Sequence, residues 1–292
     1  MTQFDAQIAS TGTELPYTKA DFQAIAKMVH AHAGICLPDG KAMLVYSRLS
    51  KLLRETGQRN FADYVQMITH DAPERARAIE ALTTNHTKFF REDHHFNHFE
   101  QEVRPDMIAR LRRGERVRMW SSASSSGEEI YSLAMVLLGN DRGQGRQLLQ
   151  TDIALLATDL SQNVLNIGEA GVYPTSATTD IPRRYFDCWT EKVGDDVRIL
   201  KEVRDLVRFR KLNLLNPWPI KGLFDVIFCR NVVIYFDEPT QMRIWSRFAE
   251  LLPVGGTLYI GHSERVSGDA KAAFDNTGIT TYRYNGKSGG KV

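Results

Sequence analysis

From about Arg116 onward, short apolar runs that suit β-strands alternate with longer runs that suit α-helices. The strand-like runs read VRMWSS, IALLATDL, LVRFRKLNLL, FDVIFCRN, GTLYIGHSE and TYRYN. The helical runs among them read EEIYSLAMVLLG, SQNVLNIGEAG and EPTQMRIWSRFAELL. Alternation of this kind predicts an α/β domain, in which right-handed crossover helices cover a doubly wound, mostly parallel sheet. We expect this Rossmann-like domain to span residues 85–286.

The alternation lapses between Tyr185 and Arg210. There the sequence reads as short antiparallel strands joined by a turn at VGDD. We therefore expect a small antiparallel β insertion in the main domain, over about residues 185–210.

Residues 16–84 carry helical patterns and few strand patterns. In KAMLVYSRLSKLLRETG, apolar and basic residues fall on opposite sides of one predicted helix. The apolar positions are Ala42, Val45, Leu49, Leu52 and Leu53. The basic positions are Lys41, Arg48, Lys51 and Arg54. We expect a small all-α domain over residues 16–84, with disordered segments at 1–15 and 287–292.

Charge and cysteine content narrow the class of protein. The formal net charge of +2 is too small to indicate a nucleic-acid partner by itself. The three cysteines, Cys36, Cys188 and Cys229, lie far apart without CxxC spacing, which argues against a disulfide framework or a zinc site. No apolar run approaches the roughly 20 residues that cross a bilayer. We expect a cytoplasmic protein.

The stretch WSSASSSGEEIY joins a predicted strand to a predicted helix through small residues and two carboxylates. Ser126 and Glu129 match an S-x-x-E capping box, and taken alone the motif favours this local interpretation. Neither GxxxxGK[ST] nor GxGxxG is present, and Glu128 with Glu129 would repel a pyrophosphate at this helix start. The loop therefore does not predict a phosphate site.

Two further strand ends carry polar residues. Asp159 ends IALLATD and lies 33 residues after Ser126, about one βαβ unit. It suits either the two hydroxyls of a ribose or the cap of the following helix. The buried-looking run FDVIFC ends at Arg230 and Asn231. Together the three ends describe a nucleoside site with negative charge for a cationic group, which predicts S-adenosylmethionine as the cofactor.

Other charged clusters support plainer interpretations. His94 and His98 have the i, i+4 spacing of a metal pair, but no third ligand or HExxH motif accompanies them, so we expect no metal. A basic run is more typical of a solvated surface than of a nucleic-acid site. Its members are Arg104, Arg110, Arg112, Arg113, Arg116 and Arg118.

Several segments, in order, resemble the bacterial chemotaxis receptor methyltransferases. They are GKAMLVYSRL, LTTNHTKFFREDHHF, SGEEIYS, ATDLSQNVLNIGEAGVY, FDVIFCRNVVIYF and LLPVGGTLYIGHSE, and the likeness runs from about Tyr17 to Tyr284. The resemblance implies an α-helical domain followed by a methyltransferase domain. It also implies methyl transfer from S-adenosylmethionine to glutamate side chains of chemoreceptors, with S-adenosylhomocysteine as the other product.

The resemblance also implies site residues. Cofactor-binding positions correspond to Asn85, Thr87, Arg91, Glu129, Asp159, Asn213, Leu214, Arg230 and Asn231. Arg91 and Tyr235 correspond to residues near the transferred methyl group. The basic helix face of Lys41, Arg48, Lys51 and Arg54 would dock a receptor's acidic flank, although such a face is about as often simply solvated. The expected partners are the cytoplasmic domains of receptors, with a monomeric enzyme that meets the membrane only through them.

Two departures from the family pattern affect these expectations. Ile130 stands where the family usually has proline, which leaves Glu129 in place. Members that bind a receptor's pentapeptide tether carry a Gly-x-Gly turn in the β insertion, whereas CWTEKVGDD offers only Gly194 among acids. We therefore expect methylation without a tether. The alternatives are a module that binds S-adenosylmethionine or S-adenosylhomocysteine without catalysis, or a methyltransferase for another substrate class.

Overall fold

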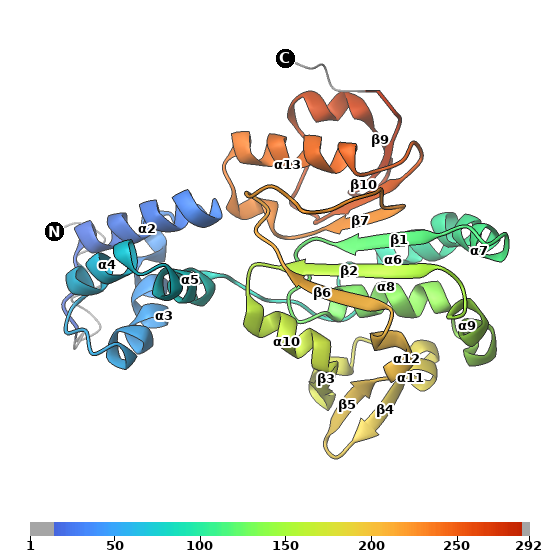
Figure 1. The fold of residues 1–292 in the computed structure, drawn as a ribbon, viewed down its shortest axis with the longest axis horizontal. Helices are drawn as coiled ribbons and strands as arrows, with labels where there is room; N and C mark the ends of the chain where they lie inside the picture. Colours follow the sequence, from blue (N-terminus) through green and yellow to red (C-terminus); the bar gives the residue numbers. More distant parts are fainter. Residues whose placement is uncertain (1–14, 288–292) are drawn as a thin grey trace. The chain divides into compact units, whose positions relative to one another are not determined.

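The structure is a computed structural model that describes residues 15–287 (Figure 1). The segments expected to be disordered, 1–15 and 287–292, lie outside the described residues except for Leu15 and Lys287. The chain forms two compact units. One contains the chain up to Thr84 together with Tyr235–Asp237, and the other contains Asn85–Ile234 and the chain from Glu238. None of the described helices combines the length and apolar character that a bilayer crossing requires.

The first unit is a bundle of short helices. Its elements are α2 (Lys19–Ala33), η1 (Asp39–Lys41), α3 (Ala42–Glu55), α4 (Phe61–His70) and α5 (Ala72–Leu82). Side chains of Thr18, Asn60 and Asp71 cap the starts of α2, α4 and α5, and Gly34 ends α2 in the left-handed conformation. The predicted apolar face of α3 is buried, which confirms that part of the sequence interpretation.

The second unit is built on a seven-stranded sheet of order β6-β2-β1-β7-β8-β10-β9. Five strands are parallel, namely β1 (Val117–Ser121), β2 (Ile153–Asp159), β6 (Val207–Lys211), β7 (Val226–Cys229) and β8 (Thr257–Ile260). Two antiparallel strands complete one edge, β9 (Phe274–Gly278) and β10 (Thr281–Tyr284). The predicted α/β class with a mostly parallel sheet is therefore confirmed.

Helices cover both faces of this sheet (Figure 1). Alternate strand residues such as Met119 and Phe228 pack into the main core with Leu133 of α8, whereas Trp120 on the other face packs against Phe248 of α13. The helices are α6 (His94–His98), the π-helical η2 (Phe99–Val103), α7 (Arg104–Arg112), α8 (Glu128–Leu138), α9 (Arg142–Leu148), α10 (Gln162–Ala170), α11 (Arg183–Trp189), α12 (Lys201–Arg204) and α13 (Glu238–Glu250). Short 3-10 turns are η3 (Thr175–Thr178), η4 (Val233–Tyr235) and η5 (Gly268–Ala273).

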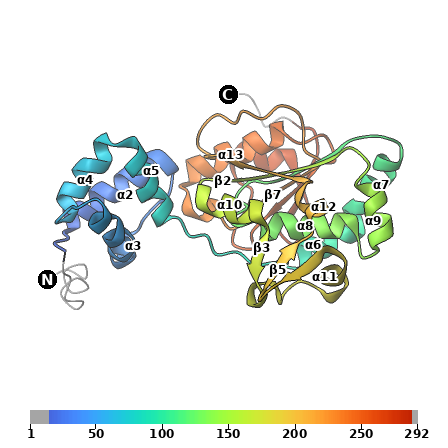
Figure 2. The same ribbon diagram turned by 60° about the horizontal axis from the view of Figure 1, so that its bottom comes forward.

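A separate three-stranded antiparallel sheet has the order β3-β5-β4 and lies beside α11 (Figures 1 and 2). Its strands are β3 (Val172–Pro174), β4 (Thr190–Val193) and β5 (Asp196–Ile199). The predicted small antiparallel insertion is confirmed, and its turn between β4 and β5 falls within VGDD, but its bounds differ from the predicted 185–210. Tyr185 and Trp189 lie in helix α11 because their i, i+4 spacing buries both in the core, and Val207 and Phe209 belong to the large sheet.

Candidate cofactor-binding and active site

The carboxyl ends of β1, β2 and β7 lie side by side, because β1 pairs in parallel with both neighbours. This brings together the three strand ends that the sequence singles out, at Ser121, Asp159 and Cys229. In open parallel sheets this edge is where ligands bind. The site is therefore described from these ends outward.

Asp159 joins two of the strand ends. One carboxylate oxygen, Oδ2, accepts the main-chain N–H of Ser125 at 2.9 Å, and Oδ1 accepts the N–H of Ser161 at 3.0 Å. The cap of α10 is Ser161, whose Oγ accepts from Val164, so Asp159 itself does not cap the helix. At 9% exposure, Asp159 holds the small-residue loop after β1 against the end of β2.

Glu129 faces Arg230 rather than the start of its own helix. Its Oε1 accepts from Ser121 Oγ at 2.6 Å, and its Oε2 accepts from Arg230 Nη1 at 3.0 Å. The predicted capping box with Ser126 is wrong, because Gly127 occupies the N-cap with φ +95° and Ser126 Oγ donates to Glu128. Burial raises the pKa of Glu129, and Arg230 and Ser121 oppose that rise.

Arg230 is the buried cation of the site, with a side chain only 1% exposed. Besides Glu129, it lies 3.5 Å from Glu92 Oε2 and donates to the main-chain carbonyl of Arg91. Glu92 Oε1 accepts from Asn231 Nδ2 at 3.2 Å. Burial raises the pKa of Glu92, but Arg230 and the hydrogen bonds outweigh it, so this pKa lies below its usual value. The sequence interpretation missed Glu92, which follows Arg91 directly.

Glu264 supports the loop after β7 from beneath. Its carboxylate accepts the main-chain N–H groups of Asn231 at 3.1 Å and of Val232, Val233 and Gly261 at 2.9, 2.9 and 2.6 Å. Only 3% of Glu264 is exposed, and burial raises its pKa against these hydrogen bonds. The sequence interpretation missed Glu264 too, although a lone acid just after strand β8 is a usable signal.

The segment before α6 contributes the remaining residues expected at the cofactor. Asn85 is exposed, and its main-chain carbonyl accepts from Ser125 Oγ at 3.0 Å. Thr87 is half-buried, and Arg91 donates from Nη1 to the carbonyl of His86 at 2.8 Å. The structure therefore brings this segment to the loop after β1.

Asn213 and Leu214 follow β6, whose last residue pairs with Asp159. The N–H of Leu212 donates to the Asp159 carbonyl at 2.9 Å, so both residues lie next to the end of β2. Tyr235 instead groups with the helical unit. Its carbonyl accepts from the N–H of Cys36 at 2.8 Å.

Four residues of these segments have left-handed backbone conformations that residues other than glycine rarely adopt. Their φ values are +50° for Phe90, +56° for Glu92, +47° for Ser125 and +56° for Asn231. Such conformations carry strain and persist where surrounding contacts enforce them, often at functional sites. The strain thus marks the same place as the buried charges.

The histidines of DHHFNH are arranged differently from the pair considered above. His98 Nδ1 hydrogen-bonds the Tyr259 hydroxyl at 2.9 Å, whereas His94 and His95 have ring nitrogens within 4.8 Å of a Glu92 oxygen. Burial, with Arg230 nearby, lowers the pKa of His95 to about 3, so this ring is neutral. Because Arg230 lies 3.5 Å from Glu92 Oε2, its charge opposes a metal ion at this cluster.

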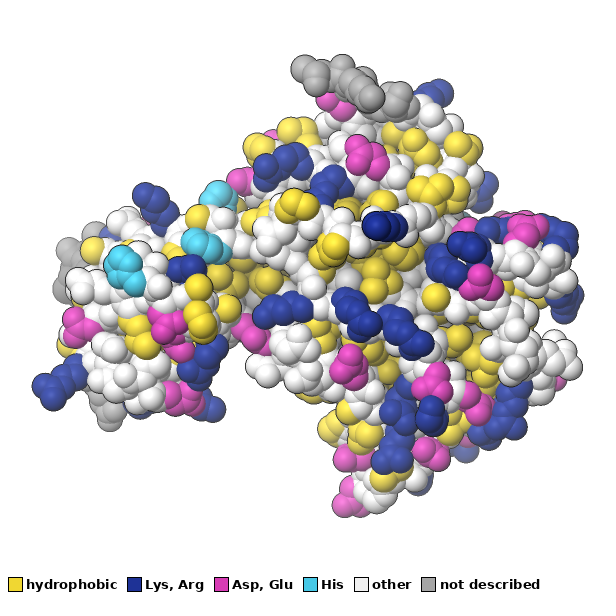
Figure 3. Space-filling model, viewed as in Figure 1, with side chains coloured by type: hydrophobic (Ala, Val, Ile, Leu, Met, Phe, Trp, Pro, Cys, Tyr) yellow, Lys and Arg dark blue, Asp and Glu magenta, His cyan; other side chains and the backbone are white. Residues whose placement is uncertain are grey.

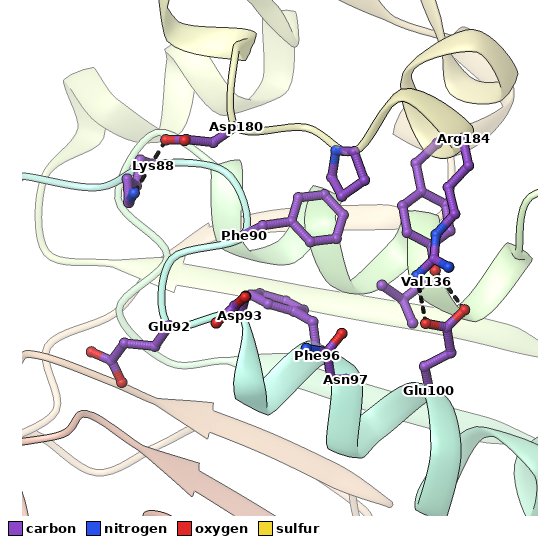
Figure 4. Close-up of a pocket in the computed structure, with 12 residues that line it drawn as sticks. Lys88, Phe90, Glu92, Asp93, Phe96, Asn97, Glu100, Val136, Asp180 and Arg184 are labelled. Carbon is purple, nitrogen blue, oxygen red and sulfur yellow. Dashed lines mark hydrogen bonds and ion pairs between the residues drawn. The ribbon is translucent and has the colours of Figure 1, made fainter.

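A pocket of about 320 Å³ is lined partly by the segment before α6, and Phe90 of that segment points into it (Figure 4). The Phe90 ring stacks on Tyr185 at 5.5 Å. Ion pairs join Lys88 to Asp180 at 3.2 Å and Arg184 to Glu100 at 2.7 Å across the walls. The contacts of Lys88 and Phe90 join the segment before α6 to α11 and to the residues just before it, and the Arg184–Glu100 pair joins α11 to η2.

Most arginines of the basic run form ion pairs or hydrogen bonds within the α/β unit. Arg110 pairs with Asp225 at 2.6 Å and Arg118 with Asp152 at 2.5 Å. Arg104 donates to the carbonyl of Leu137 at 2.9 Å. These contacts supply a structural role for the run.

Comparisons with known proteins cover nearly the whole chain. A family described as "CheR methyltransferase, SAM binding domain" matches residues 85–283, and "CheR methyltransferase, all-alpha domain" matches residues 20–83. A probable chemotaxis protein methyltransferase of Rhizobium etli is 49% identical, over 90% of this chain and 99% of that protein. Chemotaxis protein methyltransferase 2 of Pseudomonas aeruginosa is 39% identical, over 86% and 88%. The Escherichia coli chemotaxis protein methyltransferase is 37% identical, over 92% of each chain.

Proposed function

The chain belongs to the CheR methyltransferase family, and from that premise we propose how it transfers a methyl group from S-adenosylmethionine to glutamates of chemoreceptors. The observation that carries the proposal is the set of buried charges at Asp159, Glu129 and Arg230, on the ligand-binding edge of a chain that matches the family throughout. A binding module without catalysis and another substrate class are not favoured, because relatives up to 49% identical are named chemotaxis protein methyltransferases.

The residues present fit the cofactor's chemistry. Asp159 has the acceptor capacity to take ribose hydroxyls, since an ionised carboxylate offers about four lone-pair positions. Glu129 is an acid at the edge where a positively charged sulfonium or ammonium group would bind. Bound S-adenosylmethionine supplies a methyl group on a sulfonium, and Asn85, Thr87, Asn213, Leu214 and Asn231 would complete its site.

The proposed reaction needs no general base. The glutamate nucleophile has an ordinary pKa of about 4.3 and is ionised at neutral pH. What the chain supplies is alignment and removal of water from that carboxylate. Arg91 uses one N–H group on the carbonyl of His86, and we assign its other N–H groups to orienting the substrate carboxylate. We assign Tyr235 a hydrogen bond to the same substrate group.

We also propose that the helical unit docks the acidic flank of a receptor through exposed Lys41, Lys51 and Arg54. Arg48 is less suited to docking, because its Nη1 donates to the carbonyls of Leu82 at 3.0 Å and Thr83 at 2.7 Å. Charge reversal of Lys41 and Lys51 should raise the KM for receptor and leave cofactor affinity unchanged. If the KM for receptor is unchanged in this variant, the basic helix face is simply a solvated surface and does not dock the receptor.

The remaining proposals concern the oligomeric state, the cellular location and the binding partners of the protein. We propose a monomer that works in the cytoplasm, as its three free cysteines suggest, with no nucleic-acid partner and with membrane contact only through receptors. We also propose that no tether is needed, because the β4–β5 turn offers Gly194 alone, with exposed Asp195 beside it. Titration of a tether-type peptide should show no binding up to high micromolar concentration; micromolar binding would refute this.

The function itself is tested with radiolabelled cofactor and receptor-containing membranes. The wild-type protein should place base-labile label, the mark of a methyl ester, on a band of receptor size. Arg91→Ala should lose most of the label, and its affinity for the cofactor should fall much less, because the other residues assigned to the cofactor are intact. Base-stable label, or label on nucleic acid instead, contradicts the proposal.

A further inference from the structure

The face of the large sheet that packs against α13 also carries two arginines, Arg208 and Arg210, on the edge strand β6. Trp120 pairs with Leu156, which pairs with Arg208, and residues paired across parallel strands share one face. Since Trp120 packs on Phe248 of α13 at 5.3 Å between ring centres, Arg208 lies on the α13 face. Arg210, two residues along β6, lies on the same face.

Both arginines are exposed on the edge strand of the sheet. Arg208 donates to the carbonyl of Asp205 at 2.7 Å, and Arg210 donates to the carbonyl of Phe209 at 2.7 Å. Neither forms an ion pair with a carboxylate among residues 15–287. Their charges are therefore not neutralised within the described chain.

Further cations extend this surface over α13 and the loop after β6. Arg247 lies 3.7 Å over the ring of Trp218 and donates to the carbonyl of Leu214 at 2.8 Å. Arg243 hydrogen-bonds Thr240 Oγ1 at 3.0 Å, and Lys221 is exposed. None of the three forms an ion pair with a carboxylate within the described residues, although Glu250 lies close enough to act on the charge of Arg247. We call the following set the basic face: Arg208, Arg210, Lys221, Arg243 and Arg247.

Figure 3 shows dark-blue side chains over β6 and over α13 on one side of the molecule, with few acidic side chains between them. Elsewhere in the unit, arginines are commonly matched by acids, as Arg146 is by Glu202 at 3.0 Å. Basic residues on an edge strand also protect it from pairing with other chains, which explains Arg208 and Arg210. That explanation does not extend to Arg243 and Arg247, which lie on a helix.

We propose that the basic face is a docking surface for the acidic protein segment that flanks the methylated glutamate, an inference that rests on the proposed function. The substrate is itself a carboxylate side chain, so its neighbourhood meets this surface with opposite charge. Alternate residues of β6 are about 6.6 Å apart, close to the rise of about 6 Å between helical glutamates four residues apart. The strand ends at Lys211, opposite Asp159, so a segment along β6 is led to the cofactor edge.

The test uses a purified receptor cytoplasmic fragment, without membrane, as substrate for the full chain. Arg208→Glu/Arg210→Glu should raise the KM for the fragment about tenfold and weaken its direct binding equally, since each exposed pair contributes a small, additive share. Cofactor affinity and melting temperature should stay at wild-type values. Arg208→Lys/Arg210→Lys, which keeps both charges, should restore the KM.

The matched control is Arg112→Glu/Lys192→Glu, which reverses two exposed cations on α7 and β4 that form no ion pair within the described residues. Its KM should match wild type. An unchanged KM in the β6 variant, or an equal rise in the control, overturns the proposal. The proposal is also overturned if the β6 variant binds the receptor fragment normally but no longer binds anionic vesicles or an RNA oligonucleotide that wild type binds. That result would assign the basic face to a membrane or to RNA. If wild type binds the fragment but does not methylate it, the proposed function fails while the docking result stands.

Discussion

Two acids, Glu264 and Glu92, hold the loop after β7 from opposite sides. Glu264 accepts four main-chain N–H groups and thereby holds Asn231 at a φ of +56°. Glu92 holds the Asn231 side chain and Arg230 from the other side. Glu264 follows a buried strand, which is a signal that the sequence offers, whereas nothing in the local sequence singles out Glu92. Their contacts bridge segments about 30 to 140 residues apart, which only the folded chain brings together.

Asp159→Ala should weaken S-adenosylmethionine binding by about 1.5–3 kcal/mol, the usual effect of losing a charged hydrogen-bond partner. The main-chain N–H groups of Ser125 and Ser161 would also lose their acceptor. Calorimetric titration measures the change, with Asp195→Ala in an exposed turn as the control. Wild-type affinity in a folded Asp159 variant would remove this residue from the cofactor site.

His95 predicts how stability depends on pH. Its ring is fully buried and its pKa falls from 6.5 to about 3 in the folded chain, chiefly through burial. The unfolded chain therefore binds a proton below pH 6.5 that the folded chain does not, and stability should be lost as pH falls towards 3. This residue should contribute a slope of about 1.4 kcal/mol per pH unit. Denaturant unfolding of His95→Asn between pH 7 and 5 should show a shallower loss than wild type; parallel curves would contradict the assignment.

At the scale of elements, α8 begins without the capping box that its sequence, Ser126 to Glu129, would allow, and Gly127 is the N-cap instead. Gly127 takes φ +95°, and a Cβ there would meet Phe209 Cζ at 3.1 Å and Gly168 Cα at 3.2 Å. Gly127→Ala should therefore destabilise the chain and weaken cofactor binding, because Glu129 would shift with the helix. Gly222→Ala is a matched control, since its φ is +93° with no atom within 4 Å of the added Cβ. Equal losses of stability in both variants would mean that backbone strain alone acts at Gly127.

Arg48 links two helices of the first unit. It donates to the carbonyls of Leu82 and Thr83, which end α5. Arg48→Ala should lower the free energy of unfolding by about 1–2 kcal/mol, because charged hydrogen bonds to helix ends are lost. Lys51→Ala, which removes an exposed pair with Glu55 at 3.8 Å, should cost much less. Thermal unfolding decides the comparison, and equal melting temperatures would return Arg48 to the docking face.

Elements whose pattern reflects burial were predictable, and elements set by distant contacts were not. The parallel strands and the apolar face of α3 followed from periodicity. The antiparallel hairpin of β4 and β5 also followed, but the two ends of the predicted insertion did not, because α11 is defined by two buried aromatic residues and β6 by its pairing with β2. The pairing of Glu129 with Arg230, across 101 positions, overrode a capping motif that the local sequence satisfies.

At the scale of the whole molecule, the chain divides into a helical unit and an α/β unit. The α/β unit holds Asp159, Glu129, Arg230 and Arg91, the charged residues to which we assign the cofactor and the substrate carboxylate, whereas Tyr235 belongs to the helical unit. The helical unit and the basic face supply cations to which an acidic protein can bind. Recognition of a receptor should therefore weaken with added salt, whereas cofactor binding in the partly buried site should change less.

The most direct test of the account is single-turnover methyl transfer to a receptor fragment, followed as base-labile label between pH 6 and 8.5. We predict that ester forms at a nearly constant rate over this range, because the glutamate is already ionised and no general base takes part. Absence of base-labile label despite measurable cofactor binding would contradict the account, as would a rate that rises tenfold per pH unit through neutrality.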